Sequence, residues 1–233
     1  MEAEPDIRIF LPLGFYVYDT ADLYKVGTYK QYIVPGFQGF HVAGRMANIT
    51  STSPVSPLLT QRRNIPDSDF CTIATAPAKC NGILPCECLH VEDIPLNALV
   101  ELVLIDEDHF TGLSHPFHLH GQYYYIMNEA RAEDFGVEKM TVDIARDLLD
   151  KGSIKRNFDR PPAKDTHAVP NNGIVVVRMI AANPGYWLFH CHFTYHLMVG
   201  MSFILHVGED TDLPPIPEGF PKCGNFLPNI ENN

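Results

Sequence analysis

Short runs of apolar, branched and aromatic residues recur along the chain, and turn-forming residues separate them. This pattern predicts β-strands, because such residues suit a pleated, half-buried surface. We expect a first strand over residues 7–18, interrupted at Pro12, which cannot donate a backbone hydrogen bond. Further strands are predicted over residues 98–105, 122–127, 174–180, 186–192 and 201–207. Many short strands joined by turns are typical of an all-β sandwich or Greek-key barrel.

Two other parts of the chain depart from this strand pattern. Between residues 35 and 95, proline, glycine, serine and cysteine recur too often for long regular elements, which predicts loops with short strands, stapled by disulfides. Residues 141–149 show the one convincing helical pattern, with Gly152 just beyond it as a stop signal. The proline-rich tail, residues 214–233, is expected to lie over the surface.

Length and charge narrow the class of protein. A chain of 233 residues with 45% hydrophobic content can bury a full core, and no internal repeat divides it. The formal net charge of -11 argues against nucleic acid as a partner, because an acidic surface repels phosphate. No apolar run approaches the roughly 18 residues that span a bilayer. We therefore expect a single domain over residues 1–233 without a transmembrane segment.

The cysteines suggest an oxidising compartment and an incomplete chain. Several of the six lie in the loop-like stretch, which suits disulfides, and Asn48-Ile49-Thr50 is a glycosylation sequon. If Cys191 is reserved for a metal, an odd number remains and one cysteine lacks a partner. The first residues also lack the features of a signal peptide. Together these observations predict a piece of a longer secreted protein. The six are Cys71, Cys80, Cys86, Cys88, Cys191 and Cys223.

Seven of the eleven histidines lie in two short segments, 115–121 (HPFHLHG) and 190–196 (HCHFTYH). Successive side chains of a strand point to opposite faces, so the thiol of Cys191 points away from the two imidazoles that flank it. By the same rule His118 and His120 share a face, whereas His115 can face the opposite way. The sequence thus predicts two groups of ligands on opposite sides, joined covalently through Cys191.

The chemistry of both groups suits copper. Two imidazoles, one thiolate and a weak axial thioether form the ligand set of electron-transfer copper, because soft sulfur suits Cu(I) and imidazole suits both oxidation states. The all-imidazole group suits coppers that bind oxygen. The first group consists of His115, Cys191, His196 and Met201, and the second of His118, His120, His190 and His192.

Plainer interpretations exist for each of these residues. Zinc is the alternative metal, but the chain lacks the paired Cys-x-x-Cys or His-x-x-x-His steps of zinc sites. A methionine in an apolar strand is usually core filler, yet the position of Met201 after Gly200 and near His196 favours an axial ligand. The remaining histidines are expected to be incidental or structural; they are His41, His90, His109, His167 and His206.

Residues 115–121 resemble the third copper-binding signature of multicopper oxidases, and residues 190–201 resemble the fourth. The wider sequence resembles the C-terminal cupredoxin domain of arthropod laccases, and this similarity covers nearly the whole chain. The resemblance implies a cupredoxin-like Greek-key sandwich or barrel with long loops and one short helix. The further segments that carry it are 54–61 (PVSPLLTQ), 94–97 (IPLN), 164–166 (KDT), 183–187 (NPGYW) and 223–226 (CGNF).

The same resemblance implies a role for each ligand. His115, Cys191 and His196 would bind the type 1 copper, with Met201 in its axial position. His118 would bind the type 2 copper, and the type 3 pair would be bound by His120, His190 and His192. Electrons from a reducing substrate would pass from Cys191 to His190 and His192, where the full-length enzyme reduces dioxygen to water.

The resemblance also implies what this chain lacks. Full-length members supply four more cluster histidines from two His-X-His motifs in an N-terminal domain, and this sequence holds no further such motif. We therefore expect a secreted oxidase of phenols or diphenols as the parent protein, and little dioxygen chemistry from this chain without its N-terminal cupredoxin partners. Ferrous iron or ascorbate are alternative donors. A stand-alone blue-copper electron-transfer module and an inactive truncated product are the alternative functions.

Overall fold

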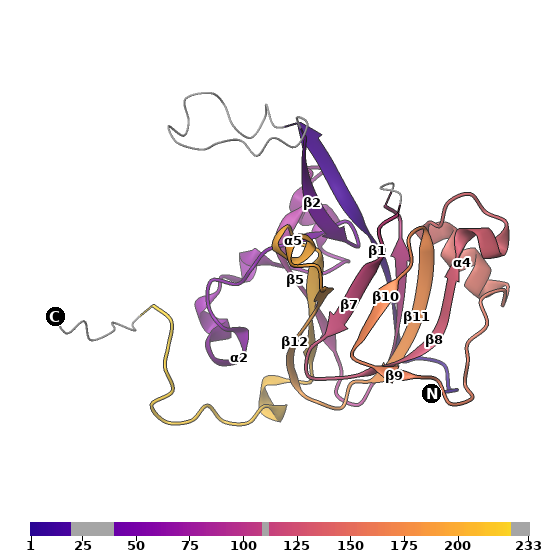
Figure 1. Ribbon diagram of the computed structural model, residues 1–233. Coiled ribbons are helices and arrows are strands. Elements are labelled where there is room, and N and C mark those ends of the chain that lie inside the picture. Colours follow the sequence, from indigo (N-terminus) through magenta and orange to yellow (C-terminus); the bar gives the residue numbers. More distant parts are fainter. Residues whose placement is uncertain (20–39, 109–111, 225–233) are drawn as a thin grey trace, which may run out of the picture.

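Two β-sheets form the framework of the computed structural model, which describes residues 1–19, 40–108 and 112–224 (Figure 1). In the first sheet the strand order is β2-β1-β6-β11-β8-β9, and in the second it is β10-β7-β12-β13-β5-β3, with β4 paired to β5. The strands are β1 Ile7–Asp19, β2 Phe40–Met46, β3 Thr50–Ser51, β4 Phe70–Cys71, β5 Glu87–Ile94, β6 Leu99–Asp106, β7 His115–Leu119, β8 Tyr124–Arg131, β9 Ala163–Lys164, β10 Thr166–Val169, β11 Gly173–Ile180, β12 Gly185–Cys191 and β13 Ser202–Val207.

The predicted helix is present as α4, Val142–Asp150, and the hydroxyl of Thr141 caps it by accepting from the backbone N–H of Ile144. The expectation of a single short helix is wrong, because one-turn helices form in the connections as well. They are α2 Leu58–Gln61, α3 Ala76–Cys80 and α5 Thr194–Met198, with 3-10 turns at Arg62–Asn64, Asp67–Asp69, Ala132–Phe135 and Asp210–Asp212. No helix in the described ranges has both the length and the apolarity that crossing a membrane requires.

Most predicted strands are confirmed, with three corrections. The strand at 122–127 begins two residues later, as β8. Strand β1 is not interrupted at Pro12, because the strand changes partner there, from parallel β6 to antiparallel β2. The stretch 35–95 is more regular than expected, since β5 is an eight-residue strand within the second sheet. Its bounding prolines, Pro85 and Pro95, flank this buried strand and do not break it.

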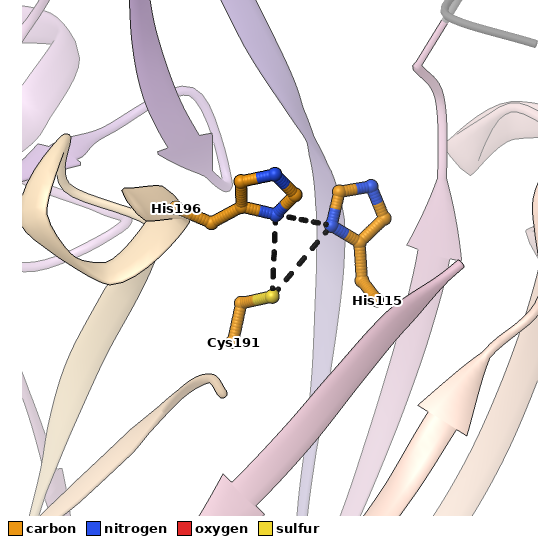
Figure 2. Close-up of side chains that lie close together, drawn as sticks. All are labelled: His115, Cys191 and His196. Atoms are coloured by element: carbon orange, nitrogen blue, oxygen red, sulfur yellow. Dashed lines mark hydrogen bonds between the residues drawn. The ribbon is translucent and has the colours of Figure 1, made fainter. Parts of the chain in front are cut away.

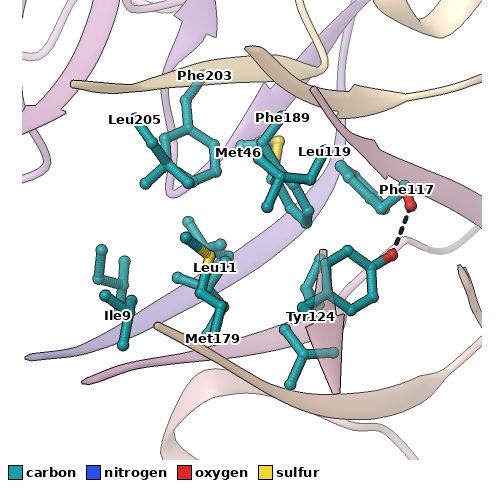
Figure 3. Close-up of a cluster of buried hydrophobic side chains, with 14 of the residues drawn as sticks. Ile9, Leu11, Met46, Phe117, Leu119, Tyr124, Met179, Phe189, Phe203 and Leu205 are labelled. Atoms are coloured by element: carbon teal, nitrogen blue, oxygen red, sulfur yellow. Dashed lines mark hydrogen bonds between the residues drawn. The ribbon is translucent and has the colours of Figure 1, made fainter. Parts of the chain in front are cut away.

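The main hydrophobic core lies between the two sheets (Figure 3). Leu11 of the first sheet faces it, as do Phe189 and Phe203 of the second, and all three are fully buried. Cys191 and Met201 belong to the same cluster. The second sheet therefore presents its inner, packed face at the residues that the sequence assigns to the first ligand group.

Strand β6 is buried along its whole length, because α4 and its flanks cover the outer face of the first sheet. This double burial explains the continuous apolar run of its sequence. Glu101 interrupts this run, with a side chain that is 0% exposed. Its cross-strand neighbours are Arg8 and Arg178, and both guanidinium groups donate to its carboxylate, at 2.6 and 2.7 Å. Arg156 adds two further hydrogen bonds, at 2.6 and 2.7 Å.

Two disulfides staple the segment before β6, Cys71–Cys88 and Cys80–Cys86. Cys191 is a free, buried thiol, and Cys223 is a free thiol at the surface. The odd cysteine expected from the sequence is therefore Cys223. Its backbone is held by Gln61, whose side-chain amide donates to the carbonyl of Cys223 at 3.1 Å and accepts from its N–H at 2.7 Å.

Candidate metal centre

Two neighbouring strands of the second sheet, with the residue that directly follows each, carry six of the eight predicted ligands. Strands β7 and β12 are antiparallel, with His190 opposite His118 and Cys191 opposite Phe117. Helix α5 starts three residues after the end of β12 and carries His196. The pairing places the imidazoles of β7 and β12 beside one another. Helix α5 then brings His196 back towards Cys191.

His115, Cys191 and His196 converge on one point (Figure 2). The Sγ atom of Cys191 lies 3.4 Å from Nδ1 of His196 and 3.7 Å from Nδ1 of His115, and these two nitrogens are 3.2 Å apart. A point equidistant from the three atoms lies about 2.0 Å from each, which matches metal–nitrogen bond lengths in proteins. The donor atoms are therefore spaced for a small ion.

Met201 is tied to this triad through its backbone. Its N–H donates to the carbonyl of His196 at 2.9 Å, and its carbonyl accepts from the N–H of Cys191 at 3.1 Å. The residue is fully buried. A Cβ on Gly44 would lie 2.9 Å from Cβ of Met201, so only glycine allows β2 to approach this closely.

Burial keeps the triad uncharged. It lowers the pKa of His115 to about 4, with the charge of His196 acting in the same direction, and it also lowers the pKa of His196. Burial raises the pKa of the Cys191 thiol to about 11. A protonated thiol beside two neutral imidazoles offers soft and borderline donors, and a bound cation would displace the thiol proton.

The second group gathers on the other side of the two strands and is more open. Nε2 of His120 lies 3.1 Å from Nε2 of His190, and the ring of His118 lies 5.0 Å from that of His120 and 5.6 Å from that of His192. His120 and His192 are exposed, whereas His190 is buried and His118 half-buried. Burial lowers the pKa of both His120 and His190.

Hydrogen bonds at Nδ1 orient two of these rings. Nδ1–H of His190 donates to the carbonyl of Cys191 at 3.0 Å, and Nδ1 of His118 meets the hydroxyl of Thr166 at 2.8 Å. Such contacts fix the ring orientation and leave Nε2 for another partner. Over the described ranges, no three ring nitrogens from different histidines of this group all lie within 4.8 Å of one another.

A pair of carboxylates beside His115 was missed by sequence reasoning. Asp106 and Asp108 form a second group of candidate donors with His115, and Oδ2 of Asp108 lies 3.9 Å from Nε2 of His115. Burial raises the pKa of Asp106 to about 6, although backbone N–H groups donate to it. The acidic residues directly after a strand were the available signal.

The other histidines form separate contacts with carboxylates. His90 pairs with Glu92 at 2.9 Å, and His167 and His206 pair with Glu129 and Asp93 at 2.8 and 2.7 Å. These contacts are those of structural histidines. The side chain of His41, all of His109 and the tail beyond residue 224 lie outside the described residues.

Comparison with known proteins is consistent across sequence and structure. A sequence model of the family described as multicopper oxidase matches residues 51–211, which is more than half of the chain. Laccase-9 of Arabidopsis thaliana is 40% identical over 137 residues, covering 57% of this chain and 21% of that protein. Laccase-24 of Oryza sativa subsp. japonica is 35% identical over 137 residues, with the same two coverages. The chain thus spans about a fifth of the length of these relatives.

Among solved structures, Fet3p, a multicopper oxidase that functions in iron import, matches 91% of this chain and 33% of its own with a TM-score of 0.56 and 23% identity. The laccase from Botrytis aclada matches 90% of this chain and 29% of its own with a TM-score of 0.52 and 20% identity. These likenesses confirm the predicted all-β, cupredoxin-like fold. Both sequence relatives are plant laccases, so the narrower resemblance to arthropod laccases stays a prediction.

Proposed function

Because the chain belongs to the multicopper oxidase family, we propose that it is the carboxyl-terminal, copper-binding cupredoxin domain of a laccase-like oxidoreductase. The observation that carries the proposal is the convergence of one thiol and two imidazoles at the spacing of a small ion, with a second set of imidazoles on the opposite side. When bound, copper would supply one-electron redox chemistry and a binding place for dioxygen. The donor set fits this metal better than zinc, because it pairs sulfur with imidazole in a buried trigonal group.

We assign the type 1 copper to His115, Cys191 and His196, with Met201 as its axial ligand. His118 is assigned to the type 2 copper, and His120, His190 and His192 to the type 3 pair. Burial of the first group excludes water from its thiol, while the exposure of His120 and His192 leaves the second group open to dioxygen. Cys191 is bonded directly to His190 and His192, so the two groups share one stretch of backbone.

The second group of imidazoles is partly exposed to solvent, which supports the proposal that this chain supplies only part of the oxygen-binding site. Four imidazoles are gathered there, and two of them face solvent. We propose that further cupredoxin domains of the same secreted protein cover this face and supply the missing ligands. The small reducing substrate would be a phenol or diphenol.

Copper loading combined with oxygen uptake tests this function. Incubation with copper should give a blue, copper-bound chain. This chain should show negligible uptake of dioxygen with 2,6-dimethoxyphenol, because the second site has only half of its ligands and should bind metal weakly. Copper content, visible absorption and an oxygen electrode provide the three readings. A colourless loaded chain would contradict the type 1 assignment, and robust four-electron reduction of dioxygen would contradict the half-site assignment.

Met201→Leu tests the axial position. The variant should keep its blue colour and show a higher reduction potential, because loss of axial sulfur disfavours Cu(II). Met179→Leu is the matched control, since Met179 is equally buried in the same core and should leave the potential unchanged. Spectroelectrochemical titration of the loaded proteins measures both. An unchanged potential in Met201→Leu would assign that residue to packing alone.

A further inference from the structure

The turn between β2 and β3 carries the one Asn-x-Ser/Thr acceptor motif of the sequence, Asn48-Ile49-Thr50. It is a tight hairpin, because the N–H of Met46 donates to the carbonyl of Ile49 at 2.9 Å and the N–H of Ile49 donates to that of Met46 at 3.0 Å. Its two central residues, Ala47 and Asn48, have φ values of 50° and 63°. Asparagine tolerates this left-handed conformation better than most residues, so the turn alone accounts for Asn48. The acceptor motif therefore needs support from the other contacts of its residues.

The side chain of Asn48 is exposed, and the fold uses only its oxygen. Its Oδ1 accepts from Nη1 of Arg45 at 2.9 Å, and its backbone carbonyl accepts from the hydroxyl of Tyr16 at 2.8 Å. Within the described residues, its Nδ2 donates to no other group. These contacts hold the carboxamide in place through its oxygen. The nitrogen, which is the atom that carries an N-linked glycan, is left without a role in the fold.

Thr50 supports the motif in a different way, because the fold uses its methyl group and not its hydroxyl. The residue is 5% exposed, and its N–H donates to the carbonyl of Cys86 at 2.8 Å. Its Cγ2 methyl lies against Gly200, where an added Cβ would come within 2.5 Å of it. The hydroxyl oxygen is buried and, among the described residues, has no hydrogen-bond partner. An unpaired buried hydroxyl destabilises a fold, and valine would fill the same space without one. A requirement outside the folded structure therefore explains this hydroxyl.

We propose that Asn48 is N-glycosylated in the secretory pathway and that the hydroxyl of Thr50 serves the glycosyl transfer, not the fold. In this transfer a bond forms between Nδ2 of Asn48 and C1 of a lipid-linked oligosaccharide diphosphate. The bond from C1 to the diphosphate breaks, the diphosphate leaves, and Nδ2 loses a proton, so no oxidant or reductant is needed. Because the hydroxyl is covered in the folded chain, the transfer precedes the pairing of β3 with β5. The proposal goes beyond the copper function and does not rest on it.

Expression of the whole chain in insect cells, behind an added signal peptide, tests the proposal. Enzymatic release of N-glycans in heavy-oxygen water converts a glycosylated asparagine into labelled aspartate, and peptide mass spectrometry locates the label. In the wild type most copies of the Asn48 peptide should carry the label. Thr50→Val should lose it, whereas Thr50→Ser, which keeps a hydroxyl, should retain it. An unlabelled Asn48 in the wild type, or a label that survives Thr50→Val, would overturn the proposal.

Two controls keep this result independent of folding. Both the secreted and the cell-retained protein are digested, so a variant that folds poorly is still read. Thr60 of α2 also has a buried hydroxyl without a partner among the described residues, but it lies outside the motif. Thr60→Val should leave the label on Asn48 unchanged. Loss of the label in Thr60→Val as well would contradict a specific role for Thr50.

A stability measurement separates the acceptor role of the hydroxyl from a role in the fold. Asn48→Asp keeps an oxygen for Arg45 and cannot be glycosylated, so it provides a background without glycan. In that background Thr50→Val should leave the melting temperature unchanged or raise it, because a methyl group replaces an unpaired buried hydroxyl. Circular dichroism records the transition. A clear fall in melting temperature would show that the hydroxyl stabilises the fold, and it would overturn the proposal.

Discussion

Cys191→Ser is expected to abolish the blue colour of the copper-loaded chain and to weaken copper binding at the type 1 site. The colour of such sites comes from charge transfer between thiolate and copper, and the Sγ atom of Cys191 lies within 4 Å of both Nδ1 donors. A serine hydroxyl is a harder and weaker donor. Visible absorption at matched copper content measures the effect.

Cys223→Ser is the matched control for this substitution. Cys223 is also a free thiol, but it is exposed and held by Gln61 at the surface. Its removal should leave the colour unchanged. A Cys191→Ser protein as blue as the wild type would reject the ligand assignment, whereas a colour lost only in Cys223→Ser would move the site to the tail.

Glu101→Ala is expected to lower the free energy of unfolding by about 3–5 kcal/mol. The substitution leaves Arg8, Arg156 and Arg178 around a buried site without their shared carboxylate, and an uncompensated buried charge is costly. Urea denaturation measures the loss. Asp147→Asn breaks an exposed ion pair with Lys151 on α4 and should cost less than about 0.5 kcal/mol. If Glu101→Ala lowered the free energy of unfolding by as little as Asp147→Asn does, the ion pairs of Glu101 would contribute little to stability.

The pH dependence of stability should report the same cluster. Burial works to raise the pKa of Glu101, but hydrogen bonds from Arg156, Arg178 and Arg8 outweigh it and lower that pKa to about 2, below the ordinary 4.5. The ionised form is therefore favoured in the fold, so its contribution is complete above pH 4.5 and is lost as the pH falls towards 2. The loss amounts to roughly 3 kcal/mol. Denaturation midpoints across this range should fall more steeply for the wild type than for Glu101→Ala.

The alternation of side chains along β12 could be predicted from sequence, because it depends only on local strand geometry. That rule separates Cys191 from His190 and His192, and the structure places them so. The approach of His196 depends on α5, a one-turn helix whose five residues carry no periodic signal. The sequence therefore predicted that His196 lies near Cys191, but it did not predict the helix α5 that places it there.

Features that depend on the register between distant segments could not be predicted. Glu101 and Arg178 face each other because β6 and β11 pair with one particular alignment, and neither sequence indicates it. The cavity lined by Val42, Thr50 and Met198 arises where segments from distant parts of the chain meet. Strand β5 was not predicted, because prolines and cysteines near it suggested a loop. In the structure the prolines lie just outside the strand, and Cys88 within it forms a disulfide. Each of these features depends on which segments come together in the fold, and the local preferences of the residues do not reveal that.

Strand β6 is buried on both faces, so substitutions there would disturb the core, whereas other parts of the molecule can be changed with less effect on the fold. The proposed copper donors His115, Cys191 and His196 lie on β7, β12 and α5, whereas β6 has no solvent-facing side along its length. Substitutions that vary the metal chemistry can therefore be confined to β7, β12 and α5. Strand β6 would serve as an untouched scaffold that tolerates changes of chemistry elsewhere.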